Sequence, residues 1–292
     1  MINLLFLFQS ASKNNESSSV FFVVLIVIGF LIIAGIGLFK FVEGFYVDFI
    51  AKKPLFRHLY LFPKELNANQ KRILENDFSF YKRLDVKQQK YFRHRVYTFI
   101  SHVDFVGKEN IKIDDEKKTL VAATAIMLTF GYRDYAINLV DKILIYPTVF
   151  YSKLDKNYHK GHFNPGYRAI ILSWEDFVHG HKIQDDNLNL GIHEFVHALH
   201  LSYLHSKRNN DISAHIFTSS LDALHAYIQS KANLKLQMEN STYFRSYAFK
   251  NDFEFTAVII ENFIETPNEF KIHFPNVYKH VKQMLNFNFI GY

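Results

Sequence analysis

The 292-residue sequence contains no cysteine. This absence excludes disulfide bonds and thiolate metal ligands, so any bound metal must be held by histidine, aspartate or glutamate. It also suits a protein of a reducing compartment. The sequence has no internal repeat and no low-complexity linker, and its ordinary apolar content is sufficient for the core of one large domain or two modest ones.

Residues 20–39 contain no charged side chain and consist only of apolar residues and glycine. A helix of about 20 such residues spans the hydrocarbon core of a bilayer. Cleavage as a secretory signal is the alternative, but the run is too long, no basic segment precedes it and no clear cleavage site follows. We therefore predict a retained single-pass anchor over residues 20–42, after an N-terminal tail over residues 1–19. A second apolar patch, residues 1–8, is too short to span a membrane.

Basic residues gather on the C-terminal side of the apolar run. Before it, Lys13 and Glu16 offset each other. Five basic residues follow it: Lys40, Lys52, Lys53, Arg57 and Lys64. Because basic flanks stay in the cytoplasm, we predict a membrane protein whose tail lies outside and whose large domain is cytoplasmic.

The net charge of +6 has two interpretations, since much of the basic excess lies in residues 40–95. A nucleic-acid-binding surface along residues 82–95 is one of them. We favour the other, in which these residues form the solvated faces of amphipathic helices near a membrane. No nucleic acid is therefore expected as a partner.

The part that follows the anchor divides into two segments. Residues 43–66 are predicted to form a juxtamembrane connector, and residues 67–292 to form one domain. Helical periodicity dominates that domain, beginning with a helix-capping signal at Asn67.

A small sheet interrupts the helices. Residues 142–150 and 167–174 are rich in apolar, strand-forming residues and predict two strands, and Pro147 indicates that the first is an edge strand. Residues 176–186 predict a loop. The expected fold class is therefore α+β, mainly helical with a small sheet, preceded by one transmembrane helix.

Residues 193–197 read His-Glu-Phe-Val-His inside an apolar, helix-forming stretch. Positions four apart lie on one helix face, so His193 and His197 can reach a single ion. Glu194 then stands beside that ion, where a base could take a proton from a metal-bound water. A catalytic zinc usually has three protein ligands and one open position, so the pattern calls for a third ligand.

That third ligand is sought among acidic residues downstream. Residues 253–264 are apolar nearly all round, yet they contain Glu254 and Glu261, two turns apart on one helix face. Buried glutamate is rare unless it is paired or bound to a metal. Glu254 is a candidate ligand or, alternatively, the ion-pair partner of Arg245. Glu261 is either a neighbour of the ligands or an ordinary ion-pair partner.

Two more histidines, His200 and His205, follow the motif on the same helix or just after it. A metzincin site would need a glycine at position 200 and a histidine at position 203, which is Tyr203. As a third ligand, His200 would need strained geometry, because it lies nearly two turns from His193. We interpret both as surface histidines or as neighbours of the ligands.

Five stretches, in this order, resemble the Mlc titration factor A family of zinc metallopeptidases. They are the alanine-rich residues 120–127, Ile-Leu-Ile-Tyr-Pro at 143–147, Leu-Ser-Trp within 171–176, Asn-x-x-x-His-Glu-x-x-His at 189–197, and Tyr-Ala, Glu-Phe and a second Glu within 247–261. The likeness covers roughly residues 74–287 and leaves the anchor outside. The metal site of that family is similar to that of the anthrax lethal factor catalytic domain.

The resemblance implies a zincin-like metallopeptidase domain with Zn²⁺ as its cofactor. It implies His193, His197 and Glu254 as the metal ligands and Glu194 as the general base. It also implies that Tyr247, seven residues before Glu254, faces the reacting carbonyl.

The residues around the ligands only partly follow the family pattern. Asn189, four residues before the first ligand, matches the family and is a candidate neighbour of the ligands, as are Glu261 and His200. The family has an aspartate where His200 stands, so the groups that orient the ligands differ here. Thr256 replaces a phenylalanine of the family, which is a milder change.

These observations predict a membrane-anchored zinc peptidase that acts on a peptide or protein substrate. Exopeptidase and endopeptidase action both remain open. The alternative is a membrane-tethered regulatory or interaction protein that keeps the fold with little or no catalysis, and His200 in place of aspartate is the feature that favours it.

Overall fold

The computed structural model of the chain describes residues 2–152, 156–183, 185–206 and 211–292, with side chains from residue 20 onward. The chain divides into two units between Leu55 and Phe56. The predicted connector over residues 43–66 spans this division, and its boundaries with the predicted domain over residues 67–292 stay predictions.

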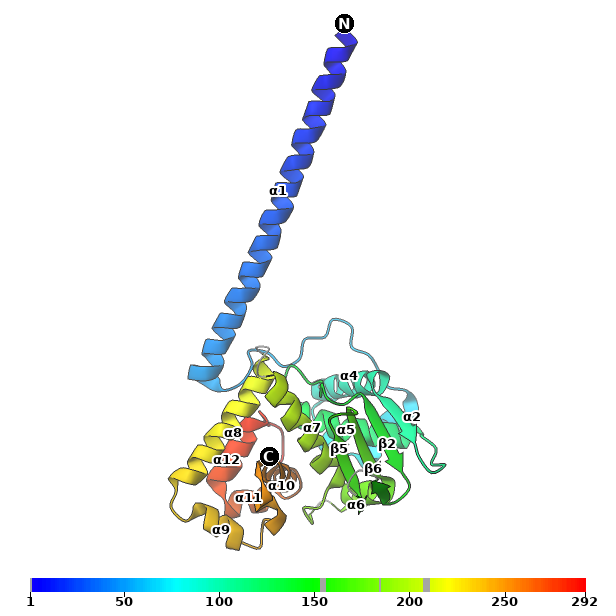
Figure 1. Cartoon of the computed structure of the whole chain (residues 1–292), viewed down its shortest axis with the longest axis vertical. Helices are drawn as coiled ribbons and strands as arrows, with labels where there is room; N and C mark the ends of the chain where they lie inside the picture. Colours follow the sequence, from blue (N-terminus) through cyan, green and yellow to red (C-terminus); the bar gives the residue numbers. More distant parts are fainter. Residues whose placement is uncertain (1, 153–155, 184, 207–210) are drawn as a thin grey trace. The chain divides into compact units, whose positions relative to one another are not determined.

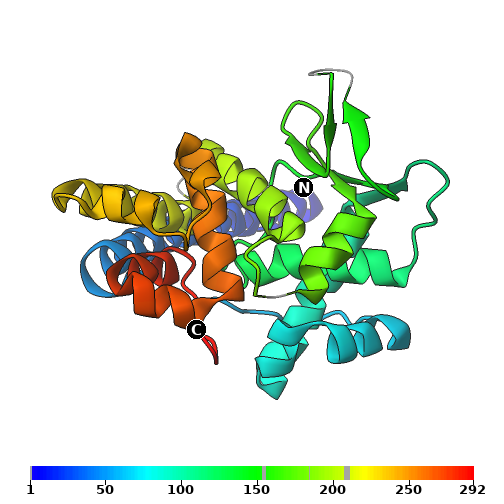
Figure 2. The ribbon, with the colours of Figure 1, turned by 90° about the horizontal axis from the view of Figure 1, so that it is seen from below.

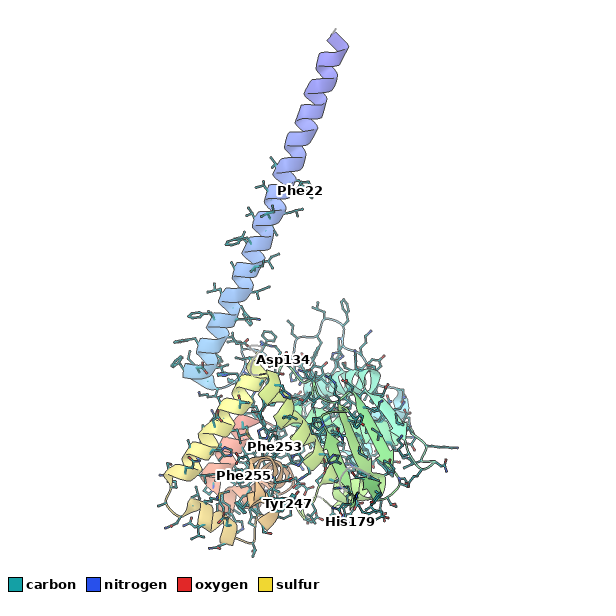
Figure 3. All side chains as sticks on the ribbon, in the orientation of Figure 1. Phe22, Asp134, His179, Tyr247, Phe253 and Phe255 are labelled. Carbon is teal, nitrogen blue, oxygen red and sulfur yellow. The ribbon has the colours of Figure 1, made fainter. Side chains whose placement is uncertain are left out.

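One helix dominates the first unit. Helix α1 (Ile2–Phe45) continues into the π-helix η1 (Tyr46–Ala51), and the stretch Val20–Ala51 is long and apolar enough to cross a membrane. Its large apolar side chains, such as Phe22, stand out on every side (Figure 3). A helix that is apolar all round needs an apolar environment all round. These properties agree with the predicted anchor over residues 20–42, although signal sequences share them.

A four-stranded sheet lies on one side of the second unit (Figure 1). In spatial order its strands are β1 (Asp104–Gly107), β2 (Lys142–Tyr146), β6 (Ala169–Ser173) and β5 (Gly161–Asn164). β1, β2 and β6 are parallel, whereas β5 pairs antiparallel with β6 and forms an edge. Two further strands, β3 (Phe150–Ser152) and β4 (Asn157–His159), pair with each other in a separate sheet.

The strand predicted over residues 142–150 is wrong in extent, because it comprises β2 and β3 with Pro147 between them. The prediction of an edge is also wrong, since β2 lies between β1 and β6. Pro147 follows Tyr146, the last paired residue, so its missing N–H removes no hydrogen bond from the ladder. The second predicted strand, over residues 167–174, is confirmed as β6.

Helices make up the rest of the second unit. They are α2 (Ala68–Asp77), α3 (Ser79–Arg83), α4 (Val86–His102), α5 (Asp115–Thr129), α6 (Trp174–Lys182), α7 (Leu190–Ser206), α8 (Ile212–Ser230), α9 (Leu234–Asn240), the 3₁₀ helix η3 (Ser246–Lys250), α10 (Asp252–Glu265), α11 (Pro267–His273) and α12 (Pro275–Met284). The capping signal at Asn67 is confirmed, because its side chain accepts from the N–H of Gln70 while the Gln70 side chain accepts from the N–H of Asn67.

The loop predicted over residues 176–186 is wrong, because α6 occupies most of that segment. The helix has local causes. The Ser173 hydroxyl accepts from the N–H of Asp176 (3.3 Å) as an N-cap. Glu175 and Asp176 place negative charge in the first turn and Lys182 places positive charge in the last turn, which complements the helix dipole.

Helix α7 lies at the centre of the second unit. It contacts α5, α6, β5 and β6 on one side and α8 and α10 on the other (Figures 1 and 2). Its buried Phe195, Val196 and Leu199 join the two halves into one core. The predicted class, a mainly helical α+β fold with a small sheet, is confirmed.

A buried arginine fixes the start of this unit to its core. Arg95 of α4 is fully buried and donates to the carbonyl oxygens of Thr129 (3.1 Å), Tyr132 (2.7 Å) and Arg57 (3.0 Å). It also donates to the hydroxyl of Tyr60 (2.6 Å). One guanidinium therefore joins the chain around residues 57–60 to the end of α5, and its hydrogen bonds offset the cost of burying the charge.

Substituting Arg95→Met should destabilise the unit by about 3 kcal/mol, because buried carbonyl oxygens lose their donors. The measurement is urea unfolding of the full chain in detergent, followed by the fluorescence of Trp174, the single tryptophan. Lys90→Met on the exposed face of the same helix is the matched control and should change the stability by less than about 0.5 kcal/mol. Equal stabilities of the two variants would contradict the assigned role of Arg95.

Candidate metal centre

Asn189 fixes the start of the helix that carries the His-Glu-x-x-His motif. Its side-chain oxygen accepts from the N–H of Ile192 (3.0 Å) and so caps α7. Its side-chain nitrogen donates to the carbonyl oxygen of Gly180 and to Glu265, both at 2.9 Å. Asn189, which was predicted as a neighbour of the ligands, therefore caps the helix one turn before His193, and these hydrogen bonds do not involve an imidazole.

The two histidines of the motif face each other. The Nε2 atoms of His193 and His197 are 3.0 Å apart, and the two rings are nearly perpendicular at 89°. Both side chains are largely buried, at 14% and 17% exposed. The spacing of four residues on α7 therefore brings two imidazole nitrogens to one point, as expected for the motif.

Helix α10 brings a carboxylate to the same point. Asn251 caps this helix by accepting from the N–H of Glu254 (3.0 Å), which places Glu254 in the first turn. Its Oε2 atom lies 3.2 Å from Nε2 of His193 and 3.5 Å from Nε2 of His197. Burial raises the pKa of Glu254, but the close approach of the His193 imidazole and the charge of His197 outweigh burial and lower it.

The three groups fit a divalent metal. Their ligand atoms lie within 4.8 Å of one another, and the measured separations are 3.0, 3.2 and 3.5 Å. Tetrahedral zinc with bonds of about 2.0–2.1 Å to nitrogen and oxygen separates its ligand atoms by about 3.3 Å. The buried Oε2 of Glu254 also has no hydrogen-bond partner. A cation at this point would satisfy that oxygen and both imidazoles.

Glu261 is held by a cation and also faces a ligand. It is almost fully buried, its Oε1 lies 3.5 Å from Nδ1 of His193, and its other oxygen forms an ion pair with Arg245. Burial raises its pKa, against the charges of His193 and Arg245. The geometry of Glu261 therefore agrees with both predicted roles, as a neighbour of the ligands and as an ion-pair partner. Arg245 pairs with Glu261 rather than with Glu254.

Glu194 lies in a tight space beside the cluster. It is buried, and burial raises its pKa to about 7, against the opposing charge of His193. Gly161, at the start of β5, packs directly on it: a Cβ atom at position 161 would stand 2.8 Å from Cγ and Oε1 of Glu194. A carboxyl with a pKa near neutrality can both accept and return a proton.

Tyr247 reaches the cluster from η3. Its hydroxyl donates to Oε1 of Glu254 (2.9 Å), and its ring centre is 6.4 Å from that of His193. Burial and the charge of Glu254 raise the pKa of Tyr247 to about 12, so the hydroxyl keeps its proton. It is a hydrogen-bond donor at the edge of the site.

His200 and His205 do not join this cluster among the described residues. The ring of His200 lies 4.5 Å from that of Phe253 and 5.7 Å from that of Phe217, and burial lowers its pKa to about 4. His200 therefore packs as a neutral ring behind the residue that precedes Glu254. His205 is exposed near the end of α7.

A cleft of about 410 Å³ opens onto the cluster. Besides the cluster and Glu194, the residues around it include Gly161, His162 and Phe163 of β5 on one side and Tyr247, Asn251 and Phe253 on the other. Tyr247 and Phe253 come from the η3–α10 stretch (Figure 3).

Sequence reasoning missed two residues of this site, Gly161 and Asn251. A glycine inside a strand signals a close approach of another group, and an asparagine three residues before a glutamate signals a helix start. Both signals were therefore present, but neither indicates which distant residue it serves.

Two comparisons with known proteins bear on this site. A family model described as glucose-regulated metallopeptidase M90 matches residues 56–286. The uncharacterized protein slr2042 of Synechocystis sp. is 24% identical over 244 residues, which cover 76% of this chain and 85% of that protein. The family match covers most of the chain and confirms the resemblance expected from the sequence. The chain therefore belongs to peptidase family M90 and is, by that membership, a metallopeptidase that hydrolyses peptide bonds.

Proposed function

We propose that this chain is a membrane-anchored, zinc-dependent peptidase in which His193, His197 and Glu254 hold the metal. The observation that carries the proposal is the meeting of two imidazole nitrogens and one carboxylate oxygen at 3.0–3.5 Å beside a cleft. Two histidines and one glutamate are a donor set of catalytic zinc sites with an open position for water.

A bound Zn²⁺ would act as a Lewis acid on the substrate carbonyl and lower the pKa of a water toward neutrality. The protein supplies the proton transfers. Glu194 accepts the proton of the attacking water and returns it to the leaving amine, since its carboxyl lines the cleft beside the cluster. Because Glu194 is buried against Gly161, its carboxyl has little freedom to turn away from the cleft.

Tyr247 is assigned to the developing oxyanion. Its hydroxyl keeps its proton, since its pKa is raised to about 12. In the resting site it donates to Glu254, and a substrate oxygen that gains negative charge is a stronger acceptor. Transfer of this one hydrogen bond from Glu254 to the oxyanion would stabilise the transition state without any change in the backbone.

The membrane part of the proposal rests on helix α1. Its span Val20–Ala51 is long and apolar enough to cross a bilayer, and basic residues such as Lys52 and Lys53 follow it. By the positive-inside rule the peptidase unit then lies in the cytoplasm. Peptides or proteins of that compartment, or the cytoplasmic segments of membrane proteins, are its substrates under this assignment.

A membrane-tethered regulatory or interaction protein with weak or no catalysis is the second candidate, and His200 favours it. Where the family resemblance implies an aspartate near the second ligand, this chain has a neutral ring packed on Phe253. Nevertheless Glu261, 3.5 Å from Nδ1 of His193, is positioned to orient that ligand. Zinc binding without any peptide hydrolysis would favour the regulatory candidate.

Substituting His193→Ala should lower the zinc content of the purified full chain from about one ion to less than about 0.2 per chain, because one of three ligands is lost. Elemental analysis measures the zinc content per chain. His205→Ala on the same helix is the control and should keep the wild-type zinc content. Unchanged zinc in the His193 variant would refute its role as a ligand.

Substituting Glu194→Gln should preserve the zinc content and lower peptide hydrolysis by a factor of about 10²–10⁴, since the amide cannot accept a proton. The assay is turnover of a fluorogenic peptide library, measured together with zinc content. A variant that retains zinc and wild-type turnover would exclude Glu194 as the base.

Substituting Gly161→Ala should displace the Glu194 carboxyl, because the new Cβ atom would stand 2.8 Å from its Cγ and Oε1, in addition to 2.5 Å from Cδ1 of Leu190. A displacement of about 1 Å is expected to lower turnover about 100-fold with zinc retained. Gly166→Ala is the matched control, since the nearest atom to its Cβ would be 3.4 Å away. Equal turnover of both variants would show that contact with β5 does not position the base.

A further inference from the structure

A short segment at the start of the second unit, residues 57–64, exposes large apolar side chains. Leu59, Leu61 and Phe62 are 71%, 83% and 85% exposed. The segment has neither helix nor strand, so no secondary structure dictates this arrangement. We call these three side chains the apolar tip.

The backbone that carries the apolar tip is fixed. Arg95 binds the carbonyl oxygen of Arg57 (3.0 Å) and the hydroxyl of Tyr60 (2.6 Å). The ring of His58 lies 4.8 Å from those of Tyr91 and Phe130. Farther along, Lys64 donates its N–H to Nδ1 of His94 (2.9 Å).

These contacts set the direction of the side chains. His58 and Tyr60 alternate with Leu59 and Leu61, and the first pair is bound to the core while the second pair is exposed. The exposure of Leu59 and Leu61 is therefore imposed by anchored neighbours, and it costs little further ordering when a partner binds.

Positive charge lies next to the apolar tip. Lys64 is exposed in the segment itself, whereas the Arg57 guanidinium packs over the ring of Phe289 at 5.7 Å. The ammonium of Lys87 lies 6.0 Å from the centre of the Tyr91 ring, on which His58 stacks. The nearby Glu65 is neutralised by ion pairs with Lys71 and Arg93. Exposed apolar side chains with a cation beside them match a bilayer surface, where acyl chains lie beneath anionic headgroups.

The tip is also within reach of the bilayer that α1 would cross. If residues 20–39 fill the hydrocarbon core, the helix from Lys40 to Ala51 rises about 18 Å at most beyond it. The eight residues from Ala51 to Leu59 can extend about 26 Å, which is enough to return to the headgroups.

We propose that Leu59, Leu61 and Phe62 insert into the headgroup region of an anionic membrane and dock the peptidase unit on its surface. This inference rests on the proposed anchoring by α1, because the anchor supplies the bilayer at close range. A nucleic acid would attract the same cations, but it would leave the three apolar side chains in water. Moreover, Arg93 and Arg95 of the basic stretch are committed to contacts within the unit.

The absence of cysteine permits a direct test by single-site labelling. The full chain carrying Leu61→Cys, Ile28→Cys or Ile272→Cys is labelled with an environment-sensitive fluorophore. Each chain is placed in vesicles of phosphatidylcholine and phosphatidylglycerol that contain a spin-label quencher lipid, with a shallow label to read position 61 and a deep label to read position 28, and position 272 is measured with both labels. Position 272 is exposed on α11 of the same unit as position 61 and is the matched control, whereas position 28 reports on the anchor.

The docking proposal predicts quenching at positions 61 and 28, each at least about twofold above position 272, and weaker quenching at 61 without phosphatidylglycerol. Quenching at 28 with position 61 equal to 272 would overturn docking and leave the anchor intact. Quenching at 61 alone would overturn the anchor and leave the docking surface. Shielding of position 61 from aqueous iodide without quenching by lipid would identify a protein contact instead and overturn docking.

Discussion

The contact between α7 and α10 is the constraint on which the site depends. An apolar helix buries Glu254 and Glu261 against α7, and such burial is unfavourable unless each carboxylate meets a positive or hydrogen-bonding group. Glu261 meets Arg245, and Glu254 meets two imidazoles and the Tyr247 hydroxyl. A metal shared by Glu254 and the histidines would offset the remaining cost. The burial of these carboxylates against α7 is unfavourable for folding, and the same burial assembles the candidate metal centre.

Rigid helix starts and a strand support that contact. Asn189 caps α7 one turn before the first histidine, and Asn251 caps α10 three residues before its first glutamate. Gly161 allows β5 to press against Glu194. Each chemical group is therefore held within a regular element, with its freedom limited by a nearby backbone. Sites held in this way keep their geometry better than sites on loops.

Local patterns predicted much of this architecture. The spacing of His193 and His197 predicted that their imidazoles converge, the two glutamates on an apolar helix were predicted as candidate partners, and the family resemblance was confirmed. Prediction failed for two different reasons. The helix α6 replaced an expected loop because Ser173 provides a cap, a local signal that the sequence prediction missed. β2 became an inner strand because β1, far away in the sequence, pairs with it. No local signal could have indicated that Arg95 would hold residues 57–60, and the chemical roles of Glu194 and Tyr247 stay predictions.

The chain direction of α10 has a consequence for its two glutamates. Glu254 stands in the first turn, where the free N–H groups give the helix end a partial positive charge of about half an elementary charge. Glu261 stands near the opposite end, where the partial charge is negative, and burial already raises its pKa. The helix dipole therefore favours the anionic form of Glu254, which faces the candidate metal position, and disfavours the anionic form of Glu261. If α10 ran in the opposite direction, both carboxyls could still face α7, but the helix dipole would then favour the anionic form of Glu261 and disfavour that of Glu254. The direction of the helix, and not only its sequence pattern, therefore contributes to the chemistry of the centre.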